Sequence, residues 1–181
     1  MSVVVITPRE GDLFDLALAK AHLRVEHGDH DALIREHVEA AASWTERWTG
    51  LALGIQTLRF DIRASLTRDG LFLPRGPVVS ISGISFDNAV DDNPVEVDAD
   101  LYLTDANRVR LKRTAAWPGP FGGPMSITYV AGYAADAMPK AIQSAILLHL
   151  NILYEQPEDK ELAALERARD DLLSPYRVRT F

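Results

Sequence analysis

Residues 45–62 read "TERWTGLALGIQTLRFDI", and within this stretch the spacing of apolar residues changes from that of a helix to that of a strand. In residues 31–49, mostly apolar residues recur every three or four positions, which predicts a helix with one buried face. The residues that recur are Ile34, Val38, Ala41, Thr45 and Trp48. Gly50 then stands where helices commonly end. The alternation in "QTLRFDI", residues 56–62, predicts a half-buried strand.

Three further helices are predicted on either side of this change. "DLALAKAHLRV" precedes it, with Asp15 as the N-cap, and "MPKAIQSAILLHLNILYE" and "KELAALERARDDLL" close the chain. Between the second and third helices lie short β-prone segments separated by Gly, Pro, Asn and Asp. In "VVSISGISF", residues 78–86, the alternation breaks and a bulge at Gly83 would restore it. Residues 117–124, "WPGPFGGP", are predicted to form a loop.

This order predicts an α+β protein with a four-helix bundle core. A small, mainly antiparallel β subdomain, residues 56–130, is inserted between the second and third long helices. We expect one domain over residues 1–181, because a chain of this length buries one good core. Pro175 ends the last helix, so residues 174–181 are predicted to be an extended C-terminal tail.

Composition excludes several classes of protein. The net charge of −7 argues against a nucleic-acid-binding regulator, and the absence of cysteine excludes disulfides and thiolate metal sites. The N-terminus lacks the pattern of a signal peptide, and the longest apolar run, about 14 residues, is too short to span a membrane. Acidic residues are concentrated between Asp87 and Asn107, where no lysine or arginine occurs.

The histidines at the start of the second helix do not form a convincing metal site. His30 and His37 would lie about 10 Å apart along the helix axis and cannot converge on one ion. His27 and His30 can approach each other but supply two ligands from a loop. We therefore expect Asp29 or Asp31 to cap the helix. A metal-dependent hydrolase that uses His27, His30 and Asp31 remains an alternative.

No nucleophile elbow, phosphate-binding loop or zinc-protease motif occurs in the sequence. We expect no enzyme activity, no catalytic residue, no cofactor and no metal site. Aromatic and apolar residues of the long helices are instead predicted to fill the bundle core or a subunit interface. These residues are Trp44, Trp48, Ile142, Ile146, His149 and Leu153.

Four segments taken together point to a family. They are "LALAKAHLRVEHGDHDALIREHVEAAASWTERWTG", "LFLPRGPVVSISGISF", "MSITYVAGYAADAMPKAIQSAILLHLNILYE" and "LLSPYR". Their order and spacing, from Leu16 to Arg177, resemble the head–tail connector (adaptor) family of long-tailed bacteriophages, prophages and gene transfer agents. The sequence departs from the family at His27 and His30, where relatives often carry acidic residues.

The resemblance implies a structural virion protein at the head–tail junction, present in the host cytoplasm during assembly. Such adaptors form a homo-oligomeric ring, commonly of twelve copies, between the portal and the stopper or tail-completion protein. Double-stranded DNA passes through the centre during ejection without specific binding, and no membrane is involved. The acidic excess suits such a conduit, because carboxylates repel phosphates. A stopper or tail-completion protein of the same machine is an alternative.

The C-terminal tail is predicted to bind the portal, since adaptors of this family reach the portal through C-terminal segments. In "SPYRVRTF", aromatic and apolar residues alternate with arginines, which suits an extended segment added to a partner. The hypothesis assigns portal contacts to Pro175, Tyr176, Arg177, Val178, Arg179 and Phe181.

Overall fold

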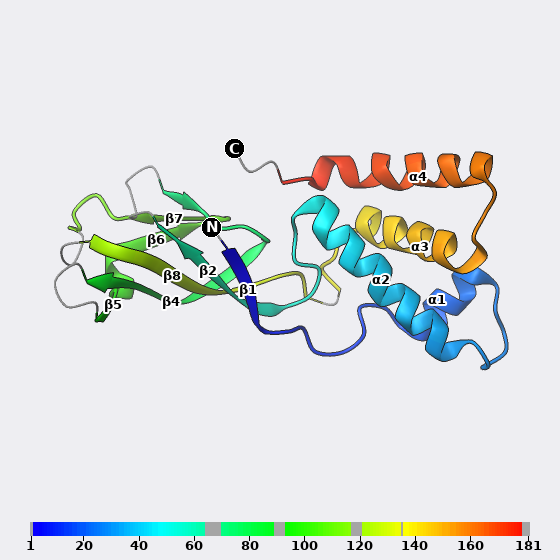
Figure 1. The fold of residues 1–181 in the computed structure, drawn as a ribbon, viewed down its shortest axis with the longest axis horizontal. Coiled ribbons are helices and arrows are strands. Elements are labelled where there is room, and N and C mark those ends of the chain that lie inside the picture. The colour runs from blue at the N-terminus through cyan, green and yellow to red at the C-terminus, as the bar shows by residue number, and fades with distance from the viewer. Residues whose placement is uncertain (1, 64–69, 89–92, 117–120, 135, 179–181) are drawn as a thin grey trace. The chain divides into compact units, whose positions relative to one another are not determined.

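The computed structural model describes residues 2–63, 70–88, 93–116, 121–134 and 136–178. The chain divides into two compact units (Figure 1). The β unit comprises Met1–Glu10 and Gly54–Gly132, and the helical unit comprises Gly11–Leu53 and Tyr133–Phe181. The β unit therefore takes in an N-terminal segment that the predicted boundary of 56–130 leaves out.

The helical unit contains α1 (Leu16–Leu23), α2 (Asp31–Thr49), α3 (Lys140–Glu155) and α4 (Asp159–Leu173). The Asp15 side chain accepts a hydrogen bond from the Ala17 amide at 3.0 Å, so its predicted role as N-cap of α1 is confirmed. Gly50 ends α2 in the left-handed conformation, as predicted. The prediction that Asp29 or Asp31 caps α2 is wrong. His30 occupies that position without a side-chain cap, and Asp31 instead pairs with Lys20 at 2.7 Å.

The core of the helical unit is centred on α3, which packs against α1, α2 and α4. This placement accounts for the wide apolar surface of α3, because three helices cover it. The fully buried side chains include Ala19, Ile34, Ala41, Ile142, Ala145, Ile146, Leu150 and Leu173. No helix in the described part of the chain is long and apolar enough to cross a membrane.

The β unit contains two sheets in which every strand pair is antiparallel. The larger sheet has the order β1-β2-β8-β4-β5, with β1 (Ser2–Thr7), β2 (Gln56–Ile62), β8 (Phe121–Ala131), β4 (Val78–Asn88) and β5 (Pro94–Glu96). The smaller sheet has the order β3-β7-β6, with β3 (Leu71–Phe72), β7 (Arg108–Leu111) and β6 (Tyr102–Asp105). A 3-10 turn, Ala99–Leu101, precedes β6. The predicted α+β class is confirmed.

Side-chain alternation decides which face of the larger sheet is buried. Along β2, Leu58, Phe60 and Ile62 are buried while the residues between them are partly or fully exposed. In β4 the register against β8 shifts between Ile81 and Gly83, as the broken alternation predicts. This bulge returns Ile84 to the buried face.

The prediction of a loop over residues 117–124 is wrong for its second half. β8 begins at Phe121, which lies opposite Asn88 of β4; residues 117–120 lie outside the described part of the chain. Pro124 lacks an N–H donor, but β2 ends at Ile62, opposite Met125. The proline therefore lies where β8 no longer needs to donate a hydrogen bond to β2.

Two glycines meet at the end of the β unit. Gly132 has a φ of +120°, and a Cβ at this position would collide with the carbonyl group of Gly54. The Gly132 amide donates to the Pro77 carbonyl at 2.9 Å. This close approach of two backbones explains why glycine stands in the segment "VAGYA".

Candidate functional site

An aromatic and cationic cluster joins three helices of the helical unit. Trp44 of α2 stacks on His149 of α3, with ring centroids 4.6 Å apart. Arg169 of α4 places its guanidinium 3.8 Å from the centroid of the Trp44 ring. One guanidinium nitrogen, Nη1, lies 2.8 Å from Nδ1 of His149. The cluster brings together two predicted residues, Trp44 and His149, with an arginine that the sequence interpretation missed.

The charge of Arg169 is buried and compensated. Arg169 and His149 are only 5% and 8% exposed. Both Nε and Nη2 of Arg169 lie 2.9 Å from Oδ1 of Asp170, and Glu166 lies 3.9 Å from Nη2. The guanidinium is paired with a carboxylate, donates to a neutral nitrogen and lies over an aromatic face. These contacts offset the free-energy cost of removing its charge from water.

Burial and the neighbouring Arg169 cation lower the pKa of His149 from 6.5 to about 4, against the opposing charge of Asp170. His149 is therefore neutral at pH 7. Nδ1 accepts the hydrogen bond from Arg169, which assigns the ring proton to Nε2. Since the basic nitrogen is already occupied, this histidine is not placed to act as a general base.

The other predicted core or interface residues lie in the same unit. Ile142 and Ile146 are fully buried, and Leu153 packs against the core from a partly exposed position. Trp48 is half-buried and stacks with Trp44 at 6.2 Å between ring centroids. Because Trp44, Trp48 and Leu153 keep part of their surface exposed, they are the members of this set that a second protein can still contact.

The C-terminal segment folds back onto α2. Ser174–Tyr176 forms a 3-10 turn, so these residues are not extended as predicted, because a proline is tolerated in the first turn of such a helix. Arg177 lies 5.1 Å from the Trp48 ring, and the Val178 amide donates to the Thr49 carbonyl at 2.8 Å.

The six residues assigned to portal binding therefore differ in accessibility. Pro175 and Arg177 are exposed, while Tyr176 and Val178 are half-buried and pack against the core of the helical unit. Arg179 and Phe181 lie outside the described residues.

The histidine-rich loop before α2 brings two of the three proposed hydrolase residues together. His27 and His30 make an edge-to-face contact with ring centroids 5.0 Å apart. Nδ1 of His30 lies 2.6 Å from the Tyr154 hydroxyl, and Asp31 is paired with Lys20. Within the described ranges, no group of three or more histidine, aspartate or glutamate side chains is arranged to hold a metal ion.

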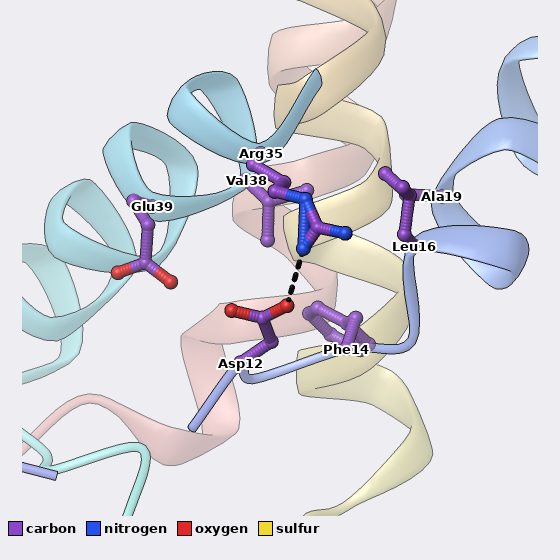
Figure 2. A pocket seen from close by; sticks show the side chains of 7 residues that line it. All are labelled: Asp12, Phe14, Leu16, Ala19, Arg35, Val38 and Glu39. Atoms are coloured by element: carbon purple, nitrogen blue, oxygen red, sulfur yellow. Dashed lines mark hydrogen bonds and ion pairs between the residues drawn. The ribbon is translucent and has the colours of Figure 1, made fainter. Parts of the chain in front are cut away.

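A small cavity lies beside α1 and α2 (Figure 2). Arg35 reaches across it to Asp12, with 2.9 Å between Nη1 and Oδ2. The rest of its wall is formed by Glu39 and by the apolar side chains of Phe14, Leu16, Ala19 and Val38. The volume of about 10 Å³ is enough for about one water molecule, whereas ligand pockets measure about 300–1,000 Å³. This cavity is not a substrate site.

No protein-family model matches the chain, and no curated protein matches it. Solved structures do match. One is a chain in the neck of an empty GTA particle computed with C6 symmetry, with a TM-score of 0.81, 24% identity, and coverage of 100% of this chain and 98% of that chain. The chain is similar to components of gene transfer agent particles over its whole length.

Two further solved structures agree. A chain in the virion of a native gene transfer agent particle has a TM-score of 0.81 and 26% identity. A chain in the neck of a native GTA particle computed with C12 symmetry has a TM-score of 0.78 and 24% identity. Both cover 100% of this chain and are themselves covered to 98%. These matches agree with the expected class, a structural virion protein rather than an enzyme.

Proposed function

We propose that this protein is a ring adaptor of a head–tail neck, placed between the portal of the capsid and the stopper or tail. The observation that carries the proposal is the likeness, over the full length of both chains, to chains from gene transfer agent necks. The neck structures are described as computed with C6 and C12 symmetry. A cyclic ring of twelve copies is compatible with both symmetries and would use heterologous contacts, in which two different faces of each subunit meet.

Two helices before the Gly54–Gly132 segment and two after it support an adaptor over a stopper or tail-completion protein, which we expect to be smaller and richer in strands. The net charge of −7 supports transient passage of DNA through the ring, since a negative surface does not retain phosphates. Assembly would take place in the host cytoplasm before the ring joins the virion.

Portal binding through the C-terminal segment remains part of the proposal, with a narrower assignment. Tyr176 and Val178 already pack within their own subunit, so they would anchor the segment rather than contact the portal. Arg177 is exposed and stacks on Trp48, where it would present a positive charge to a portal carboxylate. Arg179 and Phe181 would supply the remaining charge and the apolar contact.

Electron microscopy of the full chain mixed with the portal protein of the same particle tests this function. We expect a ring of subunits seated on the portal. Binding to the tail-side component without binding to the portal would identify a stopper instead.

A truncation separates the tail from the rest of the proposal. Removing residues 179–181 leaves the Val178–Thr49 hydrogen bond and the packing of Tyr176 in place. We expect unchanged thermal stability and a lower occupancy of the portal. Normal occupancy by this truncated chain would show that the tail is not the anchor, while leaving the adaptor role intact.

A further inference from the structure

The strand β1 forms one edge of the five-stranded sheet. It pairs with β2 along Ser2–Asp61 to Thr7–Thr57, and within the described residues no strand pairs with its other side. In Figure 1, β1 is the dark blue arrow beside β2. Backbone N–H and C=O groups along the open side of such a strand are a template for one more strand.

The side chains of β1 make this edge unusual. The sequence "SVVVIT" carries no charge and no proline. Val4, Val5 and Ile6 are 41%, 39% and 49% exposed, although they are large and apolar. These exposed residues point to both faces of the strand, because successive side chains alternate. A partner strand would therefore find apolar neighbours on either side.

Other edges in the β unit carry the features that normally prevent strand addition. At the opposite end of the sheet, β5 has three residues, begins with Pro94 and ends with Glu96. The β4 residues beyond β5 are interrupted by register shifts between Val78 and Ser80 and between Ile81 and Gly83. In β1 the pairing is regular from Ser2 to Val5, and the register shifts only between Val5 and Thr7.

We propose that β1 accepts an extended, uncharged segment of a different polypeptide, which adds to the sheet as a sixth strand. The occupant is a strand because the unpaired groups are those of backbone, and it is uncharged because the exposed side chains are apolar. A second copy of this chain is a poor occupant for two reasons. Its described edges β5 and β6 are short and each ends in a carboxylate, Glu96 and Asp105. Its own β1 would pair through a two-fold contact, whereas the proposed cyclic ring uses heterologous contacts.

This inference rests on the proposed function in naming a neck as the place where the second polypeptide is met and in excluding a two-fold contact between copies. The edge itself is a property of the isolated subunit. An experiment on the isolated chain therefore separates the two: strand addition is measured before any ring or portal is present.

The probe is an end-blocked peptide of alternating threonine and valine, added to the full chain. Hydrogen exchange of the β1 amides should slow in its presence. A peptide with the same side chains but every backbone amide N-methylated should have no such effect, because neither of its edges carries an N–H donor.

Val4→Glu tests the location. Val4 lies opposite Arg59, so a glutamate there faces an opposite charge and leaves the pairing of β1 with β2 supported. The Val4→Glu substitution nevertheless puts a charge on the open edge of β1, beside which an uncharged strand would have to lie. We therefore expect binding of the peptide to weaken at least tenfold. Leu33→Glu is the matched control: Leu33 is 46% exposed but lies in the helix α2, which has no strand edge to offer, so binding should not change.

Three results would overturn the proposal. Equal binding of the N-methylated peptide would mean that backbone pairing is not involved. Unaltered exchange of the β1 amides at saturating peptide would mean that the edge does not accept a strand. A concentration-dependent dimer of the wild-type chain that Val4→Glu abolishes would identify a second copy as the occupant.

Discussion

The two units of this chain stabilise their interiors in different ways. The helical unit buries polar and charged groups. The hydroxyls of Thr45 and Thr49 donate to the carbonyls of Ala41 and Thr45, four residues earlier in α2. Arg169 donates to His149. In the β unit, the corresponding buried polar residue in the described part is Gln56. There the specificity comes from backbone pairing, apolar alternation and the contact of Gly132 with Gly54. Side-chain chemistry specifies one interior and backbone geometry the other.

The largest effect is expected from a change to backbone geometry. Gly132→Ala places a Cβ against the Gly54 carbonyl at a φ of +120°, and strain plus steric overlap should cost roughly 3–5 kcal/mol of stability. Hydrogen exchange of β2 and β8 measures the loss.

Gly83→Ala is the control for that change. A Cβ at Gly83 meets no atom within 4 Å. Its exchange rates should match those of the wild type. Equal destabilisation by both substitutions would contradict the account of Gly132, because only one of the two glycines has a backbone reason to be glycine.

The next effect concerns the apolar core of the helical unit. Ile146 is fully buried in α3, so Ile146→Ala removes apolar contacts and leaves a cavity, at a cost of about 3 kcal/mol. Denaturant unfolding followed by tryptophan fluorescence reports it. Leu33→Ala, at a half-exposed site of α2, should cost less than about 1 kcal/mol. Wild-type-like stability of Ile146→Ala would contradict the placement of this side chain in the core of the helical unit.

A pH titration tests the buried polar cluster. The pKa of His149 is about 4 in the folded state against 6.5 for an ordinary histidine, so the unfolded chain binds the proton first as pH falls. The contribution of His149 to the free energy of unfolding is therefore fully present above pH 6.5 and is lost progressively down to pH 4, by about 3 kcal/mol.

The contribution of His149 is isolated by comparison with His149→Gln, which keeps a hydrogen-bond acceptor for Arg169 but does not titrate. The free energy of unfolding of the variant should depend less on pH between 6.5 and 4. Parallel curves for the two proteins would place the acid sensitivity elsewhere.

The smallest effect concerns a local cap. Asp15→Ala removes the side chain that accepts from the Ala17 amide and should cost about 1 kcal/mol. Asp29, which lies before α2 and forms no cap, provides the comparison: Asp29→Ala should be nearly neutral. Circular dichroism during thermal unfolding distinguishes the two.

The sequence predicted the helices well because their signals are local. The spacing of apolar residues gave α2 over Asp31–Thr49, and Asp15 and Gly50 marked helix ends correctly. Arg169 was missed because a charged residue is ordinarily read as exposed. Its position was the available signal, since it lies four residues after Leu165 and three before Leu172, on the apolar stripe of α4.

The strands were harder to predict because pairing is not local. β1 was missed although its run of β-branched residues, "SVVVIT", is itself a strand signal. Only its pairing with β2, which begins at Gln56, is not local. Phe121–Pro124 was taken for a loop from its glycines and prolines, yet pairing with β4 overrides that composition. In the tail, the alternation of Tyr176 and Val178 suggested an extended segment. Instead, Ser174–Tyr176 forms a 3-10 turn, and Tyr176 and Val178 pack against the core of the helical unit.

The division of the helical unit into Gly11–Leu53 and Tyr133–Phe181 has a consequence for synthesis. On the ribosome, α1 and α2 emerge early, but the helix that covers Ile34 and Ala41 follows only after the whole of Gly54–Gly132. At about 5–20 residues per second, that interval is on the order of 10 s. For that time the nascent chain carries an apolar helix pair that α3 does not yet cover, and such exposed apolar surface is prone to aggregation.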